Sequence, residues 1–152
     1  MRTIDERHFA APPDAVFAVV CDVLQWPVLL THYRAVRLLG ETREGRVVEM
    51  AARLGCIPLR WCASMRVDAA TRTVHYRHVA GPSTGMTVRW EISAEDAGTR
   101  VRLVHELTLT HPLLRNPLGQ WLVGWGFVSP VACRTLAGLQ AQVEGATRCD
   151  AP

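Results

Sequence analysis

The sequence contains no lysine, and all 17 basic residues of this 152-residue chain are arginine. Its net charge is only +3, and the arginines are scattered rather than gathered into the basic stripe that nucleic-acid binding requires. Long hydrophobic runs are also missing. The best of them, Trp121 to Val128, is interrupted by glycines and is too short to span a bilayer. We therefore expect a protein that binds no nucleic acid and has no membrane span.

Paired cysteines are lacking as well. The chain has five cysteines, with no CxxC spacing: Cys21, Cys56, Cys62, Cys133 and Cys149. Their odd number and spacing argue against a disulfide framework or a structural zinc site. The sequence also has no Ser/His/Asp order, phosphate loop or metal motif, so any catalysis is expected to be acid–base and electrostatic, with no metal and no cofactor. No apolar signal-peptide core stands at the N-terminus, and we expect a cytoplasmic protein.

The composition that is present suits one globular domain. Apolar residues make up 49% of the chain, which is long enough to bury a proper core, so we expect a single domain over residues 1–152. The only segment long enough for a major helix is Asn116–Glu144, where apolar residues recur at spacings of three and four. Pro130 should kink or restart this helix, with Ser129 as a second cap, and Gly145 should end it.

The N-terminal segment predicts one strand followed by two short helical pieces. The strand is expected over Thr3–Ala10, and a helix over Asp14–Val20 follows two prolines. A second helical piece over Asp22–Gln25 should end at Trp26-Pro27, because the residue before proline avoids helical geometry.

From Arg34 onward the hydrophobic period changes to two, which predicts strands. Six are expected: Arg34–Leu39, Arg46–Leu54, Leu59–Val67, Arg72–Ala80, Met86–Ser93 and Thr99–Leu109. The short turn-like connections between them imply consecutive hairpins. The sequence therefore predicts an α+β fold in which a curved seven-stranded antiparallel sheet surrounds the long C-terminal helix, with the two short helices closing one end.

Alternation indicates which side chains face the helix. The expected inward residues are Tyr76 and His78 in the fifth strand, Met86, Val88, Trp90 and Ile92 in the sixth, and Val101, Leu103, His105 and Leu107 in the seventh. The fourth strand leaves two alternatives. Its odd positions, including Trp61 and Met65, are apolar and would normally face inward. Alternatively, the even face with Ser64 and Arg66 lines a polar patch inside a ligand cavity.

Several motifs resemble the START-like (SRPBCC) polyketide cyclase/aromatase family. They are Ala11–Phe17 followed by Asp22–Pro27 and Tyr33, then Arg66–Asp68 with Arg72–Val74, Gly81–Pro82 with Met86 and Trp90, and Gly98–Arg100. The resemblance covers about residues 4 to 110. It implies the helix-grip fold and a cavity in which a poly-β-ketone, delivered on an acyl carrier protein, undergoes aldol closure and dehydration to an aromatic ring.

The same resemblance implies particular site residues. The family's pocket tyrosine and pocket arginine correspond to Tyr33 and Arg66. Other pocket positions correspond to Trp26, Ser64, Met86, Trp90 and His105. Two departures stand out: His78 occupies the place of a second arginine, and Cys62 that of an aromatic. Both bear on the ring closure rather than on the cavity.

The chemistry of aldol closure gives these residues roles. A guanidinium never loses its proton and can hold the charge of an enolate, so Arg66 is expected to be catalytic and to point into the cavity, against alternation. Tyr33 would donate a proton to a carbonyl, and His78 would act as acid or base. The other expected substrate contacts are Trp26, Ser64, Tyr76, Met86, Trp90, Leu103 and His105. The displaced apolar face of the fourth strand would then be covered by a second copy of the chain, as a homodimer.

Two functions from different classes remain open. One is a polyketide cyclase/aromatase. The other is a non-catalytic carrier of a hydrophobic or aromatic molecule, because carriers related to coenzyme-Q-binding proteins share the opening motif. Arg66 converging with a second polar group inside the cavity would favour the enzyme. A uniformly apolar cavity with Arg66 outside would favour the carrier.

Overall fold

The computed structural model describes residues 2–107, 126 and 128–149. The strands are β1 (Arg2–Phe9), β2 (Tyr33–Thr42), β3 (Gly45–Leu54), β4 (Ile57–Asp68), β5 (Thr73–Ala80), β6 (Thr87–Glu95) and β7 (Gly98–Glu106). The helical elements are α1 (Pro13–Cys21), the 3₁₀ turn η1 (Val23–Gln25), α2 (Trp26–Leu29) and α4 (Ser129–Cys149). No helix in these described ranges is long and apolar enough to cross a membrane.

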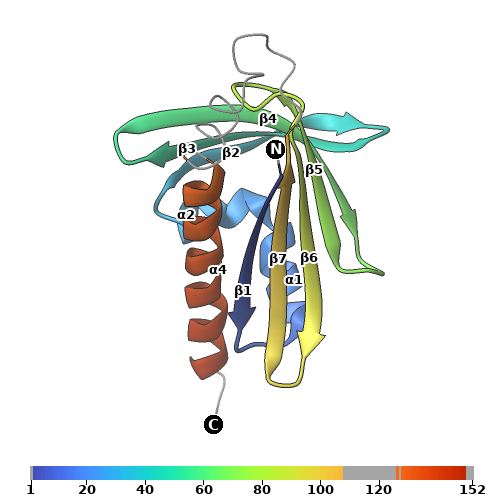
Figure 1. Ribbon diagram of the computed structural model, residues 1–152, viewed down its shortest axis with the longest axis vertical. Coiled ribbons are helices and arrows are strands. Elements are labelled where there is room, and N and C mark those ends of the chain that lie inside the picture. The colour runs from blue at the N-terminus through green and yellow to red at the C-terminus, as the bar shows by residue number, and fades with distance from the viewer. Residues whose placement is uncertain (1, 108–125, 127, 150–152) are drawn as a thin grey trace.

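The seven strands form one antiparallel sheet in the order β1-β7-β6-β5-β4-β3-β2. Figure 1 shows its curvature: β1, β7 and β6 run alongside α4, whereas β2–β4 cross it at one end. All neighbours from β2 to β7 are consecutive hairpins. The predicted meander around a C-terminal helix, with short helices after the first strand, is confirmed, and this is the helix-grip architecture.

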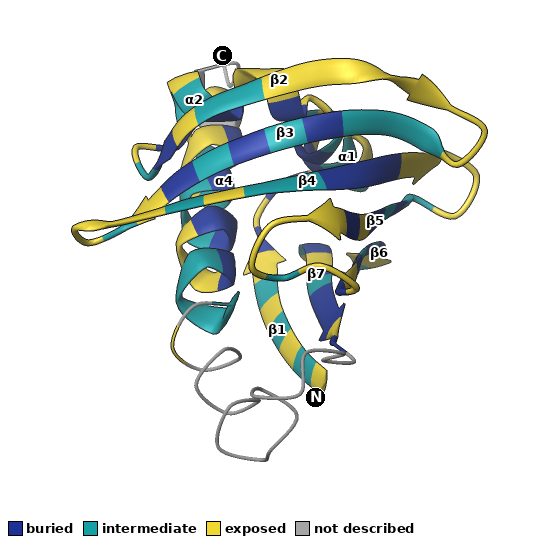
Figure 2. Ribbon diagram, turned by 90° about the horizontal axis from the view of Figure 1, so that it is seen from above, coloured by how far each residue is buried: buried dark blue, intermediate teal, exposed yellow. Residues whose placement is uncertain are grey.

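The long helix packs on the sheet through one apolar stripe. Its buried apolar residues, Ala132, Leu136, Leu139 and Val143, recur at spacings of four, three and four. Figure 2 shows buried segments along α4, and shows β2 exposed over most of its length.

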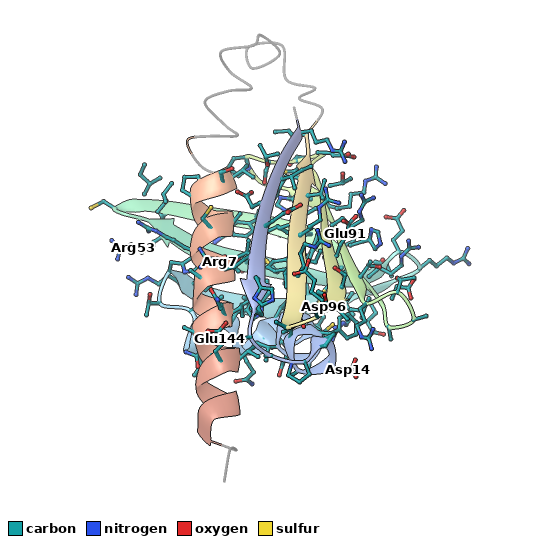
Figure 3. The ribbon with its side chains drawn as sticks, turned by 60° about the horizontal axis from the view of Figure 1, so that its bottom comes forward. Arg7, Asp14, Arg53, Glu91, Asp96 and Glu144 are labelled. Atoms are coloured by element: carbon teal, nitrogen blue, oxygen red, sulfur yellow. The ribbon has the colours of Figure 1, made fainter. Side chains whose placement is uncertain are left out.

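Polar contacts fix the C-terminal half of α4 to β1 and its following turn. Arg7 Nη1 donates to Gln140 Oε1 at 2.9 Å, and Gln140 Nε2 donates to the His8 carbonyl at 2.9 Å. The amide of Ala10 donates to Glu144 Oε1 at 2.9 Å, and the labels of Arg7 and Glu144 in Figure 3 mark this seam. Because β1 is an edge strand, α4 covers the edge of the sheet that would otherwise be free.

The C-terminal helix differs from its predicted bounds. Within the described residues it begins at Ser129, with Pro130 in its first turn, so the proline that was expected to restart the helix lies at its start. The earlier part of the predicted segment, 116–125, lies outside the described residues. The predicted stop at Gly145 is wrong, because the helix continues to Cys149; an exposed glycine in a last turn costs only about 1 kcal/mol relative to alanine.

The expected helix end at Trp26-Pro27 is also wrong. Helix α2 begins there, with Trp26 in helical geometry (φ −55°, ψ −36°) although it precedes a proline. Proline at the first turn leaves no amide donor unused. The conformation disfavoured for Trp26 is offset by its burial and by a hydrogen bond from its Nε1 to the Val19 carbonyl at 3.2 Å.

The tight turn between β6 and β7 depends on Gly98. Its φ of +144° disfavours other residues, and a Cβ there would overlap the Phe9 carbonyl oxygen at the end of β1. Gly98→Ala should therefore lower the free energy of unfolding by about 1–3 kcal/mol, measured by urea denaturation. Gly40→Ala is the matched control, because a Cβ at Gly40 meets nothing within 4 Å. Equal stability of the two variants would contradict this account of the turn.

Candidate functional site

A cavity of about 330 Å³ lies between the sheet and the N-terminal part of α4. The sheet contributes aromatic and apolar side chains from β2 to β7, and Arg60 of β4 also lines the cavity. The helical side is formed by short residues, Val128, Val131, Ala132 and Thr135, which leave room that longer side chains would fill. The volume lies at the lower end of the range typical of small-molecule sites. The cavity that the sequence predicted between sheet and helix is therefore present.

Most of the residues expected to form the site line this cavity. They are Trp26, Tyr33, Tyr76, His78, Met86, Trp90, Leu103 and His105. Alternation placed those of β5, β6 and β7 on the inner face, and the structure has them there.

Aromatic rings form a continuous wall of the cavity. The ring centroids of Trp26 and Tyr33 are 5.3 Å apart, and those of Trp26 and Trp90 are 5.7 Å apart. On the other side Trp61 stacks on the His78 ring at 5.9 Å with an interplanar angle of 9°. Such flat surfaces favour a planar, unsaturated ligand.

The hydroxyl of Tyr33 is held against α4. Thr135 Oγ1 donates to the Val131 carbonyl at 2.8 Å and lies 3.0 Å from His32 Nε2. Burial raises the pKa of Tyr33 to about 12, and a hydrogen bond with Thr135 opposes this effect only in part. Tyr33 thus stays protonated across the physiological range and can act only as a neutral donor or acceptor.

The second tyrosine of the cavity has an unused hydroxyl. Tyr76 Oη is buried and has no hydrogen-bond partner among the described residues. Burial, followed by the nearby Tyr33 and Cys21, raises the pKa of Tyr76 well above its ordinary value. An unpaired buried hydroxyl costs free energy, so a ligand oxygen in the cavity would find a donor already desolvated.

His78 is fixed by a neutral partner. Its Nδ1 lies 2.6 Å from Ser83 Oγ in the β5–β6 connection. Burial lowers the pKa of His78 to about 3, with a smaller effect from His105. A serine hydroxyl cannot balance the charge of an imidazolium, so this histidine is suited to accept or donate a hydrogen bond rather than to hold a proton.

His105 faces a carboxylate instead. Its Nδ1 lies 3.9 Å from Asp5 Oδ2, and neither atom has a hydrogen-bond partner among the described residues. Cys133 of α4 donates a hydrogen bond to Asp5, with 3.5 Å between Sγ and Asp5 Oδ1. Burial lowers the pKa of His105 to about 4 and also raises the pKa of Asp5. The two groups are thus a buried acid–base pair behind the cavity wall.

The structure corrects the expectation for the fourth strand. Arg66 is exposed and lies with Ser64 on the outer face, whereas Ala63 and Met65 are buried on the inner face. The strand follows the ordinary alternation for an energetic reason. An inward guanidinium without a carboxylate partner would cost several kcal/mol of desolvation, whereas burial of the Met65 side chain stabilises the fold. The second copy that was invoked to cover an outward Met65 is therefore not needed.

Sequence reasoning missed the polar residues that support the cavity side chains. Asp5 lies on the inner face of β1, a strand whose inward positions are mostly polar and carry no apolar alternation. No local signal marks it, because Asp5 lies diagonally from His105, whose direct partner is Thr3, and that neighbourhood exists only after β1 has paired with β7. Ser83 and Thr135 gave no such signal, because their contacts depend on the turn and on the helix position.

Comparison with known proteins was made against families, curated sequences and solved structures. The chain is 33% identical over 105 residues to the granaticin polyketide synthase bifunctional cyclase/dehydratase of Streptomyces violaceoruber, an alignment that covers 66% of this chain and 32% of the relative. The chain thus spans about a third of the length of that relative.

Solved structures share the fold. The Zhui aromatase/cyclase from Streptomyces sp. R1128 superimposes with a TM-score of 0.80 at 21% identity, covering 95% of this chain and 93% of that one. The di-domain aromatase/cyclase BexL of the BE-7585A biosynthetic pathway gives a TM-score of 0.77 at 24% identity, covering 95% of this chain and 46% of that one. A family model described as polyketide cyclase/dehydrase and lipid transport matches residues 2–144. With nearly the whole described fold inside that match, the chain belongs to the polyketide cyclase/dehydrase and lipid transport family.

Proposed function

We propose that this protein is a cofactor-independent polyketide cyclase/aromatase that promotes aldol closure and dehydration of a poly-β-ketone in the cavity. The observation that carries the proposal is an aromatic-walled cavity whose buried polar groups are neutral donors or acceptors, one of them an unpaired tyrosine hydroxyl. The charged residue Arg60, which also lines the cavity, is exposed and pairs with Glu49 at 3.7 Å. A folded chain of alternating carbonyl and methylene groups offers oxygens to such groups and flat surfaces to the rings. The similarity to a cyclase/dehydratase supports the same reaction class.

In this proposal the tyrosines take the role that the sequence had assigned to Arg66. Removal of a proton from a methylene between two carbonyls gives an enolate, whose carbon attacks a distant carbonyl of the same chain. Negative charge develops on the oxygens of both groups, and the neutral hydroxyls of Tyr33 and Tyr76 donate to them without needing a counterion. Loss of water from the resulting alcohol then forms the carbon–carbon double bond.

His105 is the proposed base, with Asp5 as its positioning residue. A base that accepts a proton in an apolar cavity becomes a buried cation, which is costly unless a negative group lies near. Asp5 stands 3.9 Å behind Nδ1 of His105, whereas His78 has only the Ser83 hydroxyl. The imidazolium then gives its proton to the alkoxide formed by the attack. In the dehydration the same histidine takes a second proton from the carbon next to the alcohol and gives it to the departing hydroxyl, which leaves as water, so one pair serves both steps.

A second candidate function, a carrier of hydrophobic molecules, is favoured by the exclusion of Arg66 from the cavity and by the lipid transport activity named in the family description. A carrier would bind the same planar ligands without changing them. The Trp26, Trp61 and Trp90 rings allow binding to be followed by fluorescence independently of turnover.

Tyr76→Phe tests the donor role. The variant should cyclise a synthetic linear poly-β-ketone thioester about a hundredfold more slowly, as expected when one donor to a developing oxyanion is removed. Because Tyr76 Oη has no partner among the described residues, the free energy of unfolding should not fall. Product formation would be followed by liquid chromatography with mass spectrometry, and stability by urea denaturation. Met86→Leu, which keeps the cavity volume, serves as the control.

A wild-type protein that binds the thioester but does not accelerate ring closure over the spontaneous reaction would reject the enzyme and leave the carrier. A Tyr76→Phe variant with wild-type rate would reject only the donor role.

Asp5→Asn tests the acid–base pair. The variant should cyclise roughly tenfold to a hundredfold more slowly, since the imidazolium loses its carboxylate. The acidic limb of the pH–rate profile should also move to lower pH, because removal of a negative group further lowers the pKa of His105. The control is Glu6→Gln, which makes the same charge change on the outer face of β1, where Glu6 pairs with Arg102. An unchanged profile in Asp5→Asn would assign Asp5 a purely structural role.

A further inference from the structure

A second hollow, of about 410 Å³, lies on the outer face of the sheet, on the opposite side from the cavity. Its wall is formed by outward residues of β4 to β7 and by the turn between β2 and β3. Its charged and hydroxyl-bearing residues are Arg43, Glu44, Ser64, Arg66, His75, Arg77, Thr87, Arg89 and Glu106. We refer to this hollow, with these residues, as the outer groove.

Two arginines flank a histidine across the outer groove. Arg66 of β4 pairs in register with His75 of β5, which pairs with Arg89 of β6. Burial and then these two arginines lower the pKa of His75, with Asp68 and Glu91 opposing them in part. A histidine with a lowered pKa is mostly neutral at pH 7, so Arg66 and Arg89 repel each other across it with no opposite charge between them. The arrangement therefore carries a cost that an alternating pattern of charges would have avoided.

Neighbouring arginines of the same face show that alternating pattern. Arg89 Nε lies 2.7 Å from Glu91 Oε1, and Arg102 Nη1 lies 3.3 Å from Glu91 Oε2. Figure 3 shows Glu91 on this outer side, away from α4. The guanidinium groups of Arg66 and Arg77, by contrast, form no hydrogen bond or ion pair with any residue in the described ranges, although Arg66 is near enough to Asp68 to lower the pKa of that carboxyl. The arginines without a carboxylate partner thus lie in the outer groove, whereas their neighbours on the same face are paired.

The two acidic residues of the outer groove do not restore that balance. Glu106 is already paired with Arg2 at 3.3 Å. Glu44 is then one carboxylate against Arg43 and the two unpaired arginines, so the hollow keeps a net positive charge. An anion of more than one charge would relieve the repulsion and supply the missing partners.

We propose that the outer groove binds the phosphate group of a small soluble molecule. Hydroxyls stand beside the guanidinium groups: Ser64 lies opposite Arg77, and Arg77 lies opposite Thr87. Two guanidinium forks and two hydroxyls offer more donors than the two oxygens of a carboxylate can accept, and they match a tetrahedral oxyanion. This inference is independent of the proposed function, because the groove and the cavity lie on opposite faces of the sheet.

Pyrophosphate is a suitable probe. Isothermal titration calorimetry at low ionic strength should show binding by the wild-type protein and a loss of about tenfold or more in the Arg66→Gln/Arg77→Gln variant, each lost charge-assisted contact being worth up to about one decade. The matched control is Arg34→Gln/Arg37→Gln, which removes the same charge from exposed positions of β2 outside the groove and should bind as the wild type does. Equal losses in both variants would mean a general charge effect and would overturn the proposal.

Two further readouts separate a built site from a structural role. Without anion, Arg66→Gln should raise the melting temperature at low salt, because it removes the repulsion between Arg66 and Arg89. A lower melting temperature would show that Arg66 stabilises the fold, and would overturn the proposal. Pyrophosphate should raise the pKa of His75 in a nuclear magnetic resonance titration, by adding negative charge between Arg66 and Arg89.

Vesicles of phosphatidylglycerol and phosphatidylcholine in equal parts test the source of the phosphate. Pyrophosphate binding without cosedimentation supports a soluble ligand. Cosedimentation that is lost in the Arg66→Gln/Arg77→Gln variant would overturn the soluble source in favour of a lipid headgroup. The absence of any pyrophosphate binding by the wild type would overturn the proposal itself.

Discussion

The two halves of α4 pack differently against the sheet, and the rest of the structure depends on this difference. Its C-terminal half is fixed by Leu136, Leu139 and Val143 and by the hydrogen bonds of Gln140 to β1. Its N-terminal half meets the curved sheet across an open space instead. Because one end of the helix is tightly packed, the other can be held away from the strands without collapsing onto them. The cavity is thus a product of how the helix is anchored, and its stability is supplied elsewhere in the molecule.

The cost of desolvation explains why the inner cavity and the outer groove contain different kinds of polar residue. The buried groups inside, where a charge would be costly, are tyrosines with raised pKa values and histidines whose pKa values lie at about 3 and 4, while Arg60 lines the cavity from an exposed position. Outside, Arg66 and Arg77 keep their charge in contact with solvent. Asp5 is the exception, a carboxyl group at the edge of the inner space whose pKa burial raises. If catalysis takes place in the cavity, it relies on neutral donors and on this one acid–base pair.

Much of the fold could be predicted from periodicity, because the physical cause is local. Trp90 and Leu103 alternate with charged residues, and only one face of such a strand can be buried. The inward orientation predicted for Arg66 was wrong, because it followed a family resemblance, whereas the same alternation places Arg66 on the outer face. Asp5 could not be found, since its importance comes from His105, which is a neighbour only after β1 has paired with β7. The helical geometry of Trp26 was missed for a related reason: burial of its ring, which no local rule contains, outweighs the preference of a residue before proline.

The pairing of β1 with β7 also sets the order in which the molecule can be assembled. Every other strand pair joins neighbours in the sequence, but Arg2 lies opposite Glu106, and α4 completes the seam with β1. Strand β1 must therefore wait unpaired until β7 has been made. The hairpins from β2 to β7 can form in the meantime. The cavity is lined partly by α4, so it is complete only when α4 packs against the sheet and bonds to β1, after the hairpins have formed.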